Sequence, residues 1–522
     1  LTKTETWIVL ASTWMFGAVL ALDRLTSASY QTIATNSFDS HSLLTLVSVT
    51  RSISAVSALP VFAQVYELIG REWAYASGLV IYIAGNTLMA VSQNIAQYGA
   101  GACLHEVGAN GLFVSQLLLI AALSSSRNRL FFQVLPQTAF FVLGFPSAKI
   151  YNAVLAGPGW RFGISTFSFL VPVALLPLLV SLFLARRRHA RAQRFGVSTD
   201  VPVQHTSRSV AVQLWINADL VGLLLLVITL SLLLVPLVLA TRLQASFSSA
   251  KVLAPLLVGA LVGLPCFLAW ERFGARRPAI PLELVASRAV FFSAAASMLF
   301  WCGWTVCTTY LPTILYVVMD TSDTEQQYIS AIFNTTTAAM QVVVVAPTVR
   351  WIRRLYPFQI SGIILALVST IMLTAFTTAN DKVRIAMAML VAGVGDAMFA
   401  PATLVSIQVT VPDRHLASAT ASWSIMFFIG SAVGSAIAGA TWSELVQNKL
   451  ESLSQFSASE QAQVYAEPLT WIENNSAGSI IRAAVIGSVY SPTQRVLAII
   501  GSVIMGVAVL IALFCPHPVL SD

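Results

Sequence analysis

The sequence predicts an all-α integral membrane protein with fourteen membrane-spanning helices, on three observations. Apolar residues make up 57% of the 522 residues and charged residues make up 10%, well below the roughly 25% charged residues of a typical soluble domain. The mean hydropathy is +0.78. Apolar runs of about 20 residues, the length that crosses the hydrocarbon core of a bilayer, recur along the chain. These observations exclude a soluble enzyme, a nucleic-acid-binding protein and a disordered protein.

The apolar runs fall into groups of six, two and six. The first six predicted spans are residues 7–29, 42–66, 73–92, 97–123, 131–151 and 162–184. The next two are 219–240 and 251–270. The last six are 289–318, 326–349, 357–376, 384–410, 416–442 and 491–514. The predicted domains are an N-terminal half (1–184), a cytoplasmic loop with two linker helices (185–288) and a C-terminal half (289–522) with an external loop at 443–490.

The positive-inside rule sets the predicted orientation. With the N-terminus inside and the spans alternating, eighteen of the 29 Lys and Arg residues lie on the inner side and nine on the outer side, while Arg24 and Arg51 fall within spans. The basic run at 186–194 then follows the sixth span on the inner side, next to membrane lipid. The net charge of +7 is therefore interpreted as a sign of orientation, and no nucleic-acid partner is expected.

Two halves of six spans joined by a basic loop are typical of the major facilitator superfamily, whose members bind substrate between the halves. The inner loop after the second span supports this interpretation, because Glu67, Gly70 and Arg71 match the acidic-x-x-Gly-Arg signature of that superfamily. Glycine permits a tight turn there, and the acid and the arginine can lock the halves together. We predict a cytoplasmic gate at these three residues; the alternative is an ordinary basic loop.

Ionisable side chains inside the predicted spans are the main candidates for a functional site, because charge in a bilayer is costly. Asp23 and Arg24 lie in the first span, Arg51 in the second, and His105 and Glu106 in the fourth. At a rise of about 1.5 Å per residue, all five fall in the outer half of the membrane. We predict that they neutralise one another and bind substrate or protons; the alternative is an inert ion pair between Arg51 and Glu106.

Other polar and aromatic side chains complete the predicted substrate-binding or proton-coupling set. In the first half they are Tyr30, Gln31 and Asn110. In the second half they are Trp304, Tyr310, Asp396 and Gln408. Asp396 falls near mid-depth in its span, which makes it a candidate proton carrier. A packing or membrane-interface role fits Trp304 equally well.

The sequence offers little that points to catalysis or to a bound metal. Its five Cys residues form no CxxC pair, and four of them lie inside apolar runs, as buried cysteines often do. There is no cluster of metal-ligand residues, no phosphate-binding loop and no nucleophile with a base at useful spacing. We therefore predict a protein that is not an enzyme and has neither a metal site nor a cofactor.

Short motifs in order along nearly the whole chain resemble those of the fungal siderophore–iron transporters, a fourteen-span branch of the major facilitator superfamily. The first is Ser29-Tyr30-Gln31 followed by Ala34-Thr35-Asn36-Ser37-Phe38. Later ones are Asp219-Leu220-Val221-Gly222, Val405-Ser406-Ile407-Gln408 and Gly430-Ser431-Ala432-Val433-Gly434. The chain departs from the family at His105-Glu106, where Tyr-Gln is usual, and at Asp396, where the family is commonly glycine-rich.

The resemblance implies a secondary active transporter that imports ferric siderophores with protons, the iron being carried inside the substrate. It also implies that the loop at 443–490 covers the outer mouth, where Tyr465 and Tyr490 are placed. The departures at the predicted cavity leave a haem transporter or a glutathione–proton exchanger open, with a drug–proton antiporter or a transport-inactive nutrient sensor less favoured. We expect a monomer in the plasma membrane, with a vacuolar or endosomal membrane as the alternative.

Overall fold

The structure is a computed structural model. It describes residues 3–38, 43–124, 129–194, 216, 218–239, 249–276, 278, 287–375, 381–412, 416–452, 458–466, 468, 471–472 and 485–515. Across these ranges the chain is almost entirely helical. The predicted all-α class is confirmed.

The N-terminal half consists of α1 to α7. Its helices are α1 (Lys3–Ser37), α2 (Leu44–Leu68), α3 (Arg71–Ala90), α4 (Ile95–Leu123), α5 (Arg129–Val134), η2 (Leu135–Gln137), α6 (Thr138–Ala156) and α7 (Trp160–Arg194). The two linker spans follow as α9 (Leu220–Leu239) and a broken rod of α10 (Ala250–Val258), η3 (Gly259–Gly263), α11 (Leu264–Ala269) and η4 (Trp270–Gly274). Short π-helical segments interrupt this rod at η3 and η4.

The C-terminal half consists of α13 to α23. Its helices are α13 (Arg288–Thr308), α14 (Leu311–Val317), α15 (Asp323–Met340), η5 (Gln341–Val345), α16 (Ala346–Ile352), α17 (Tyr356–Ala375), α18 (Lys382–Thr410), α19 (Leu416–Glu451), α20 (Ala458–Ala466), η7 (Ile486–Tyr490) and α23 (Ser491–Ala512). Several predicted spans are therefore built from two helices in line, such as α13 with α14 and α15 with α16.

Thirteen helical stretches of the described chain are long and apolar enough to cross a membrane. The remaining predicted span is α3, a helix of 20 residues that packs against α4 and α7. Its sequence is less apolar because it carries Arg71, Glu72 and Asn86. Each of the fourteen predicted spans thus has a helix in the structure.

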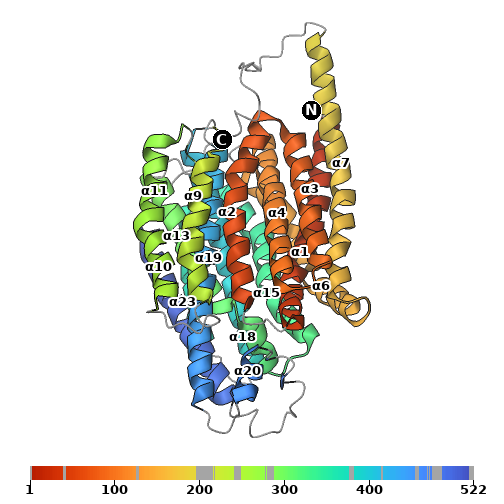
Figure 1. The fold of residues 1–522 in the computed structure, drawn as a ribbon. Coiled ribbons are helices and arrows are strands. Elements are labelled where there is room, and N and C mark those ends of the chain that lie inside the picture. The colour runs from red at the N-terminus through yellow and green to blue at the C-terminus, as the bar shows by residue number, and fades with distance from the viewer. Residues whose placement is uncertain are drawn as a thin grey trace.

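Two helices run further than predicted. α7 continues ten residues beyond residue 184, through the basic run, and it projects past the rest of the bundle (Figure 1). Alanine and arginine are good helix formers, so the helix continues although its residues are no longer apolar. α19 continues past residue 442 to Glu451, because Val446 and Leu450 lie four residues apart and pack in the core with Val464 of α20. The segment predicted as the loop 443–490 therefore contains helix.

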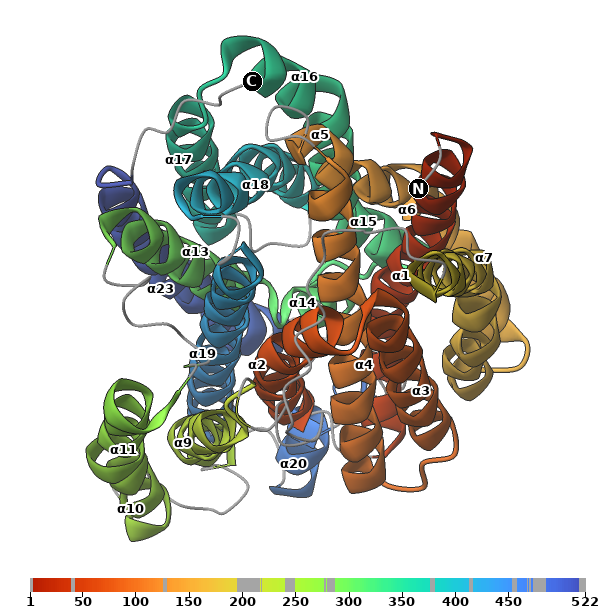
Figure 2. The ribbon, with the colours of Figure 1, turned by 90° about the horizontal axis from the view of Figure 1, so that it is seen from above.

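The two halves stand side by side, with the linker helices against one flank (Figures 1 and 2). Across the boundary between the halves, α2 packs against α19 and α6 packs against α15. α9 contacts both α2 and α19. Most residues that line the space between the halves come from α1, α2, α4, α13, α15, α18 and α19, and others come from α5, η2, α6, η5 and α14.

Candidate functional site

Asp23 of α1 is held by three side chains in the interior of the N-terminal half. Its carboxylate accepts hydrogen bonds from Tyr82 of α3 (2.8 Å) and from Ser27 (2.7 Å). Nε2 of His105 on α4 lies 2.9 Å from Asp23 Oδ2. Asp23 is 2% exposed and His105 is 3% exposed, so the pair is shielded from water. Asp23 and His105 are therefore in contact, as predicted.

A second pair joins α2 to α4. Arg51 donates through Nε and Nη2 to Glu106 Oε2, at 3.1 and 2.9 Å, and through Nη1 to Gln31 Oε1 at 2.7 Å. Asn110 donates to Glu106 Oε1 at 2.8 Å. Nδ1 of His105 lies 4.0 Å from Glu106 Oε2 and links the two pairs. The predicted residues Gln31, Arg51, Glu106 and Asn110 therefore form one polar network.

A glycine at the crossing of α3 and α4 positions this network. A Cβ atom at Gly85 would overlap the backbone of His105, so only glycine lets the two helices approach this closely. The close approach places Tyr82 and His105 on the same carboxylate, with their rings 4.9 Å apart. Sequence reasoning missed Tyr82; the one available signal was a phenol hydroxyl inside an apolar span, which usually finds a hydrogen-bond partner when buried.

Arg24 lines the outer cavity beside these residues but forms none of their hydrogen bonds or ion pairs. Consecutive residues on a helix point about 100° apart, so Arg24 turns away from the pairs that hold its neighbour Asp23. Its guanidinium lies over the ring of Phe113, 5.1 Å from the centroid. It has no ion-pair partner in the described part of the chain, and the side chain is exposed.

Two cavities lie between the halves, one above the other. The cavity nearer the predicted outer surface, called the outer cavity, has an empty volume of about 1310 Å³ and is lined by polar residues that include Asp23, Gln31, Arg51, His105 and Glu106. The inner cavity has an empty volume of about 1290 Å³ and is lined by Trp301, Phe333, Asp396, Trp423 and Phe427 among others. Leu20, Arg24, Phe427 and Phe428 line both. These volumes include space that is open to solvent. The interior space is about 400 Å³ in the outer cavity and about 230 Å³ in the inner one, against the roughly 300–1,000 Å³ of ordinary ligand pockets.

Asp396 lines the inner cavity from α18. It is 5% exposed, and its Oδ1 has no hydrogen-bond partner within the described ranges. Thr337 of α15 lines the same cavity but donates to the carbonyl of Gly393, at 3.1 Å. The predicted mid-depth position of Asp396 thus coincides with an unpartnered carboxylate oxygen at a cavity wall.

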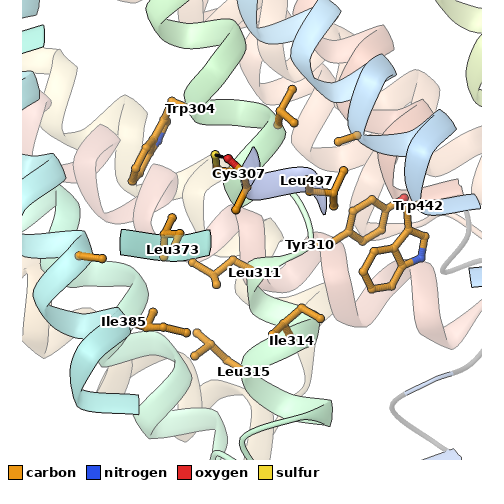
Figure 3. Close-up of a cluster of buried hydrophobic side chains, with 14 of the residues drawn as sticks. Trp304, Cys307, Tyr310, Leu311, Ile314, Leu315, Leu373, Ile385, Trp442 and Leu497 are labelled. Atoms are coloured by element: carbon orange, nitrogen blue, oxygen red, sulfur yellow. Dashed lines mark hydrogen bonds between the residues drawn. The ribbon is translucent and has the colours of Figure 1, made fainter. Parts of the chain in front are cut away.

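Five residues of the predicted substrate-binding or proton-coupling set line neither cavity, namely Tyr30, Asn110, Trp304, Tyr310 and Gln408. Three of them are aromatic. Tyr30 packs against Tyr151 with ring centroids 5.0 Å apart. Trp304 is stacked on Phe333 at 4.6 Å, and Tyr310 is stacked on Trp442 at 4.0 Å. Figure 3 shows Trp304 and Tyr310 among the apolar side chains of the C-terminal core. The sequence alone does not distinguish an aromatic side chain of the core from one that lines a cavity. The tryptophan that lines the inner cavity is Trp301, one turn before Trp304.

Gln408 connects the halves at the end of the bundle that is predicted to face inward. Gln133 of α5 donates to Gln408 Oε1 at 3.1 Å, and Gln408 donates through Nε2 to Thr420 of α19 at 3.0 Å. Gln133 lines the inner cavity and Gln408 does not. At the other end, Ser29 of α1 accepts a hydrogen bond from Gln327 of α15, and Asn152 of α6 donates to Thr324 at 2.5 Å. Sequence reasoning missed these neutral contacts.

The motif predicted as a cytoplasmic gate forms a tight turn between α2 and α3. Gly70 has φ +125°, a conformation that side-chain-bearing residues rarely adopt. The guanidinium of Arg71 lies 5.9 Å from the ring centroid of Tyr66. The neighbouring acid, Glu72, forms an ion pair with Arg186 of α7. These contacts all lie within the N-terminal half, and the assignment of Glu67, Gly70 and Arg71 to a gate stays a prediction.

The two tyrosines assigned to the outer mouth are held by hydrogen bonds at the far end of the C-terminal half. Tyr465 donates to Ser443 at 3.0 Å. Tyr490 donates to the carbonyl of Val464 at 3.0 Å and lies 5.6 Å from the ring of Trp442. Much of the segment between them lies outside the described residues.

The described residues contain no group of three or more His, Cys, Asp or Glu side chains that could hold a metal ion. Within the described residues the site therefore consists of a paired ionic network, two cavities, an arginine that forms no ion pair and a carboxylate with one oxygen that has no hydrogen-bond partner. Such a site can bind a solute and move a proton.

Comparisons with known proteins give the same picture. The model of the Major Facilitator Superfamily matches residues 293–445. The chain is 26% identical to "Siderophore iron transporter ARN1" of Saccharomyces cerevisiae over 99% of this chain and 82% of that protein. It is 29% identical to "Siderophore iron transporter ARN2" of the same yeast, over 93% and 79%. It is 27% identical to "MFS siderochrome iron transporter C" of Aspergillus fumigatus, over 96% and 82%.

Solved structures support the fold alone. The tetrameric transporter PepTSo2 is 13% identical and covers 98% of both chains with a TM-score of 0.58. A POT peptide transporter in complex with alafosfalin is 12% identical and covers 98% of this chain and 96% of that one, with a TM-score of 0.53. The predicted major facilitator fold, the location in a membrane with many spans and the resemblance to siderophore–iron transporters are confirmed.

Proposed function

Because this chain has the major facilitator fold and resembles siderophore–iron transporters over nearly its whole length, we propose that it is a secondary active transporter that imports ferric siderophores. The observation that carries the proposal is the similarity to ARN1, which extends over 99% of the chain. A similarity confined to one motif would support the fold only. Here the similarity covers both halves and the linker helices between them.

The cavities supply a route for such a substrate. The outer cavity is polar and the inner cavity is largely aromatic, and together they extend through the boundary between the halves. Major facilitator transporters bind substrate at this boundary, near the middle of the bilayer. We propose that the substrate passes from the outer to the inner cavity.

Alternating access requires contacts that can open at one end while those at the other end close. The amide pair of Gln133 and Gln408 at the inner end, and the contact between Ser29 and Gln327 at the outer end, join different halves. Neutral hydrogen bonds contribute about 0.5–1.5 kcal/mol each, so they can break during a transport cycle. We propose that these contacts separate in turn as the halves rock.

Proton coupling is the second part of the proposal. Ionisable side chains inside a membrane protein commonly mark proton pathways. Asp396 lies at the wall of the inner cavity and the pair of Asp23 and His105 lies at the wall of the outer cavity. We propose that Asp396 carries the proton and that the Asp23 pair supports the outer cavity.

Uptake of radioactive iron tests the proposal. Yeast cells that lack their own siderophore transporters would express the protein and receive ferric siderophores labelled with radioactive iron. Expected is uptake above the empty-vector control that stops when a protonophore is added. Lack of uptake for every siderophore, with the protein present in the plasma membrane, would overturn the proposed function. Uptake that is unchanged by the protonophore would overturn the proposed proton coupling and leave the proposed import of siderophores standing.

A further inference from the structure

Among the described residues, Arg24 is the one cation at the junction of the two cavities. It lines both the outer and the inner cavity. Its side chain is exposed and lies over Phe113 at 5.1 Å. Phe427 and Phe428 of α19 line both cavities as well. A solute that moves from one cavity to the other therefore passes this guanidinium and these two rings.

The nearby carboxylates of the outer cavity are already occupied by other partners. Asp23 accepts from Tyr82 and Ser27 and lies against His105. Glu106 accepts from Arg51 and Asn110. Arg24 has no ion-pair partner in the part of the chain that the structure describes. Its exposed guanidinium therefore faces the cavities with N–H donors that a substrate anion can reach.

Arginine also differs from lysine in what it recognises. Its planar guanidinium presents a fork of N–H donors that fits the paired oxygens of an oxyanion, and it packs on aromatic rings. The guanidinium packs over the Phe113 ring and lines both cavities, where its N–H groups can meet a solute. Near it, Trp301 lines the inner cavity with an indole N–H that has no hydrogen-bond partner among the described residues.

We propose that Arg24 sets substrate selectivity by binding an oxyanion of a negatively charged ferric chelate, one that carries carboxylate or catecholate groups. This inference rests on the proposed function, because it names the class of siderophore that the same cavities accept. The aromatic walls of the inner cavity receive the apolar part of the chelate. Neutral ferric trihydroxamates carry no net negative charge on their oxygens and gain nothing from Arg24.

Uptake kinetics with three labelled chelates test the inference in whole cells. The substrates are a ferric polycarboxylate, a ferric tris-catecholate and a neutral ferric tris-hydroxamate, and the variants are Arg24→Gln and Arg24→Lys. Loss of one charge-assisted hydrogen bond changes affinity by about tenfold or more. For Arg24→Gln we expect KM to rise at least about tenfold for an anionic chelate and less than about twofold for the neutral one. For Arg24→Lys we expect KM values for the anionic chelates between those of Arg24→Gln and the wild type.

Controls separate folding from recognition. Lys382→Gln removes an exposed cation that pairs with Glu325 far from the cavities, and it should leave all three KM values unchanged. Binding of the gallium forms of the same chelates to purified protein, followed by tryptophan fluorescence, reports affinity without transport. The two anionic chelates distinguish carboxylate from catecholate recognition, and selectivity for either one supports the inference.

The outcomes for the inference and for the proposed function are distinct. Equal KM changes for charged and neutral chelates in Arg24→Gln, or no change for any of them, would overturn the role of Arg24 while import of siderophores stands. Failure of the wild-type protein to bind or transport any of the three chelates would instead overturn the proposed function.

Discussion

The side-chain amide of Gln133 donates a 3.1 Å hydrogen bond to the amide oxygen of Gln408, although the two residues are 275 positions apart in sequence. The bond joins α5 of the N-terminal half to α18 of the C-terminal half. Gln133 and Gln408 are 7% and 2% exposed, so water does not replace the bond while the halves are in contact. Gln408 continues the contact to Thr420. A transporter that opens inward must separate these side chains.

A double-mutant cycle tests whether this contact controls opening. Gln133→Leu and Gln408→Leu each break the bond and leave one amide without its partner, which costs about 1–3 kcal/mol. We expect each single variant to lower the uptake rate about three- to tenfold. The double variant should lose no more than the worse single variant, because both act on one bond. Losses that multiply in the double variant would show that the two amides act independently.

The crossing of α3 and α4 gives a stability prediction with a matched control. A Cβ at Gly85 overlaps the backbone of His105, whereas a Cβ at Gly99 meets nothing within 4 Å. Gly85→Ala should therefore lower the melting temperature of the detergent-purified protein by several degrees and reduce expression. Gly99→Ala should match the wild type in a thermal-shift assay. Equal melting temperatures for the two variants would contradict the close helix contact.

The ionic network shows how much of the site can be predicted from sequence. Charges in apolar spans must find partners because unpaired charge is costly there, and this principle alone predicted that Asp23, Arg51, His105 and Glu106 would meet. It offered Arg51 with Glu106 only as the alternative of an inert ion pair, and it did not pair Asp23 with His105. The choice of His105 for Asp23 depends on the approach of α3 to α4 at Gly85, which is a matter of tertiary packing.

Arg24 lines both cavities and forms no ion pair within 4.0 Å in the described part of the chain, so its share in neutralising the charges of the ionic network stays a prediction. Helix geometry predicts that the side chains of Arg24 and Asp23 point in different directions. Which of these directions faces a cavity depends on where the neighbouring helices pack, and the sequence does not show this. Trp304 and Tyr310 show the other limit. Their apolar rings are stabilised equally by a protein core and by a cavity wall, and the sequence holds no signal that distinguishes these two surroundings. The fourteen spans were predictable because the bilayer imposes both length and composition.

The pair of Arg51 and Glu106 is expected to be essential for transport. Glu106→Gln removes the charge that Arg51 faces and leaves a largely buried cation, with 18% of the Arg51 side chain exposed. Breaking one partner of a buried pair costs about 3–5 kcal/mol. We expect siderophore uptake to fall at least tenfold in this variant. Glu67→Gln, at the turn between α2 and α3, should leave the half-saturating siderophore concentration within about twofold of wild type. Similar losses of affinity in both variants would argue against a cavity role for Glu106.

Asp396 gives the sharpest test of proton coupling. Its carboxylate lines the inner cavity with one oxygen unpartnered within the described ranges, so Asp396→Asn changes the titratable group while preserving its size. If Asp396 carries the proton, the variant still binds substrate and exchanges it across the membrane, because both processes are possible without net proton movement. It should fail to concentrate substrate against a gradient, and its uptake should lose the stimulation by external acid that we expect of a proton symporter.

Reconstituted vesicles with an imposed pH gradient measure accumulation and exchange separately. Glu325→Gln, which removes an exposed acid paired with Lys382, is the control and should retain both activities. Accumulation by Asp396→Asn that still follows the pH gradient would assign the proton to another group, and Asp23 with His105 would be the next pair to test.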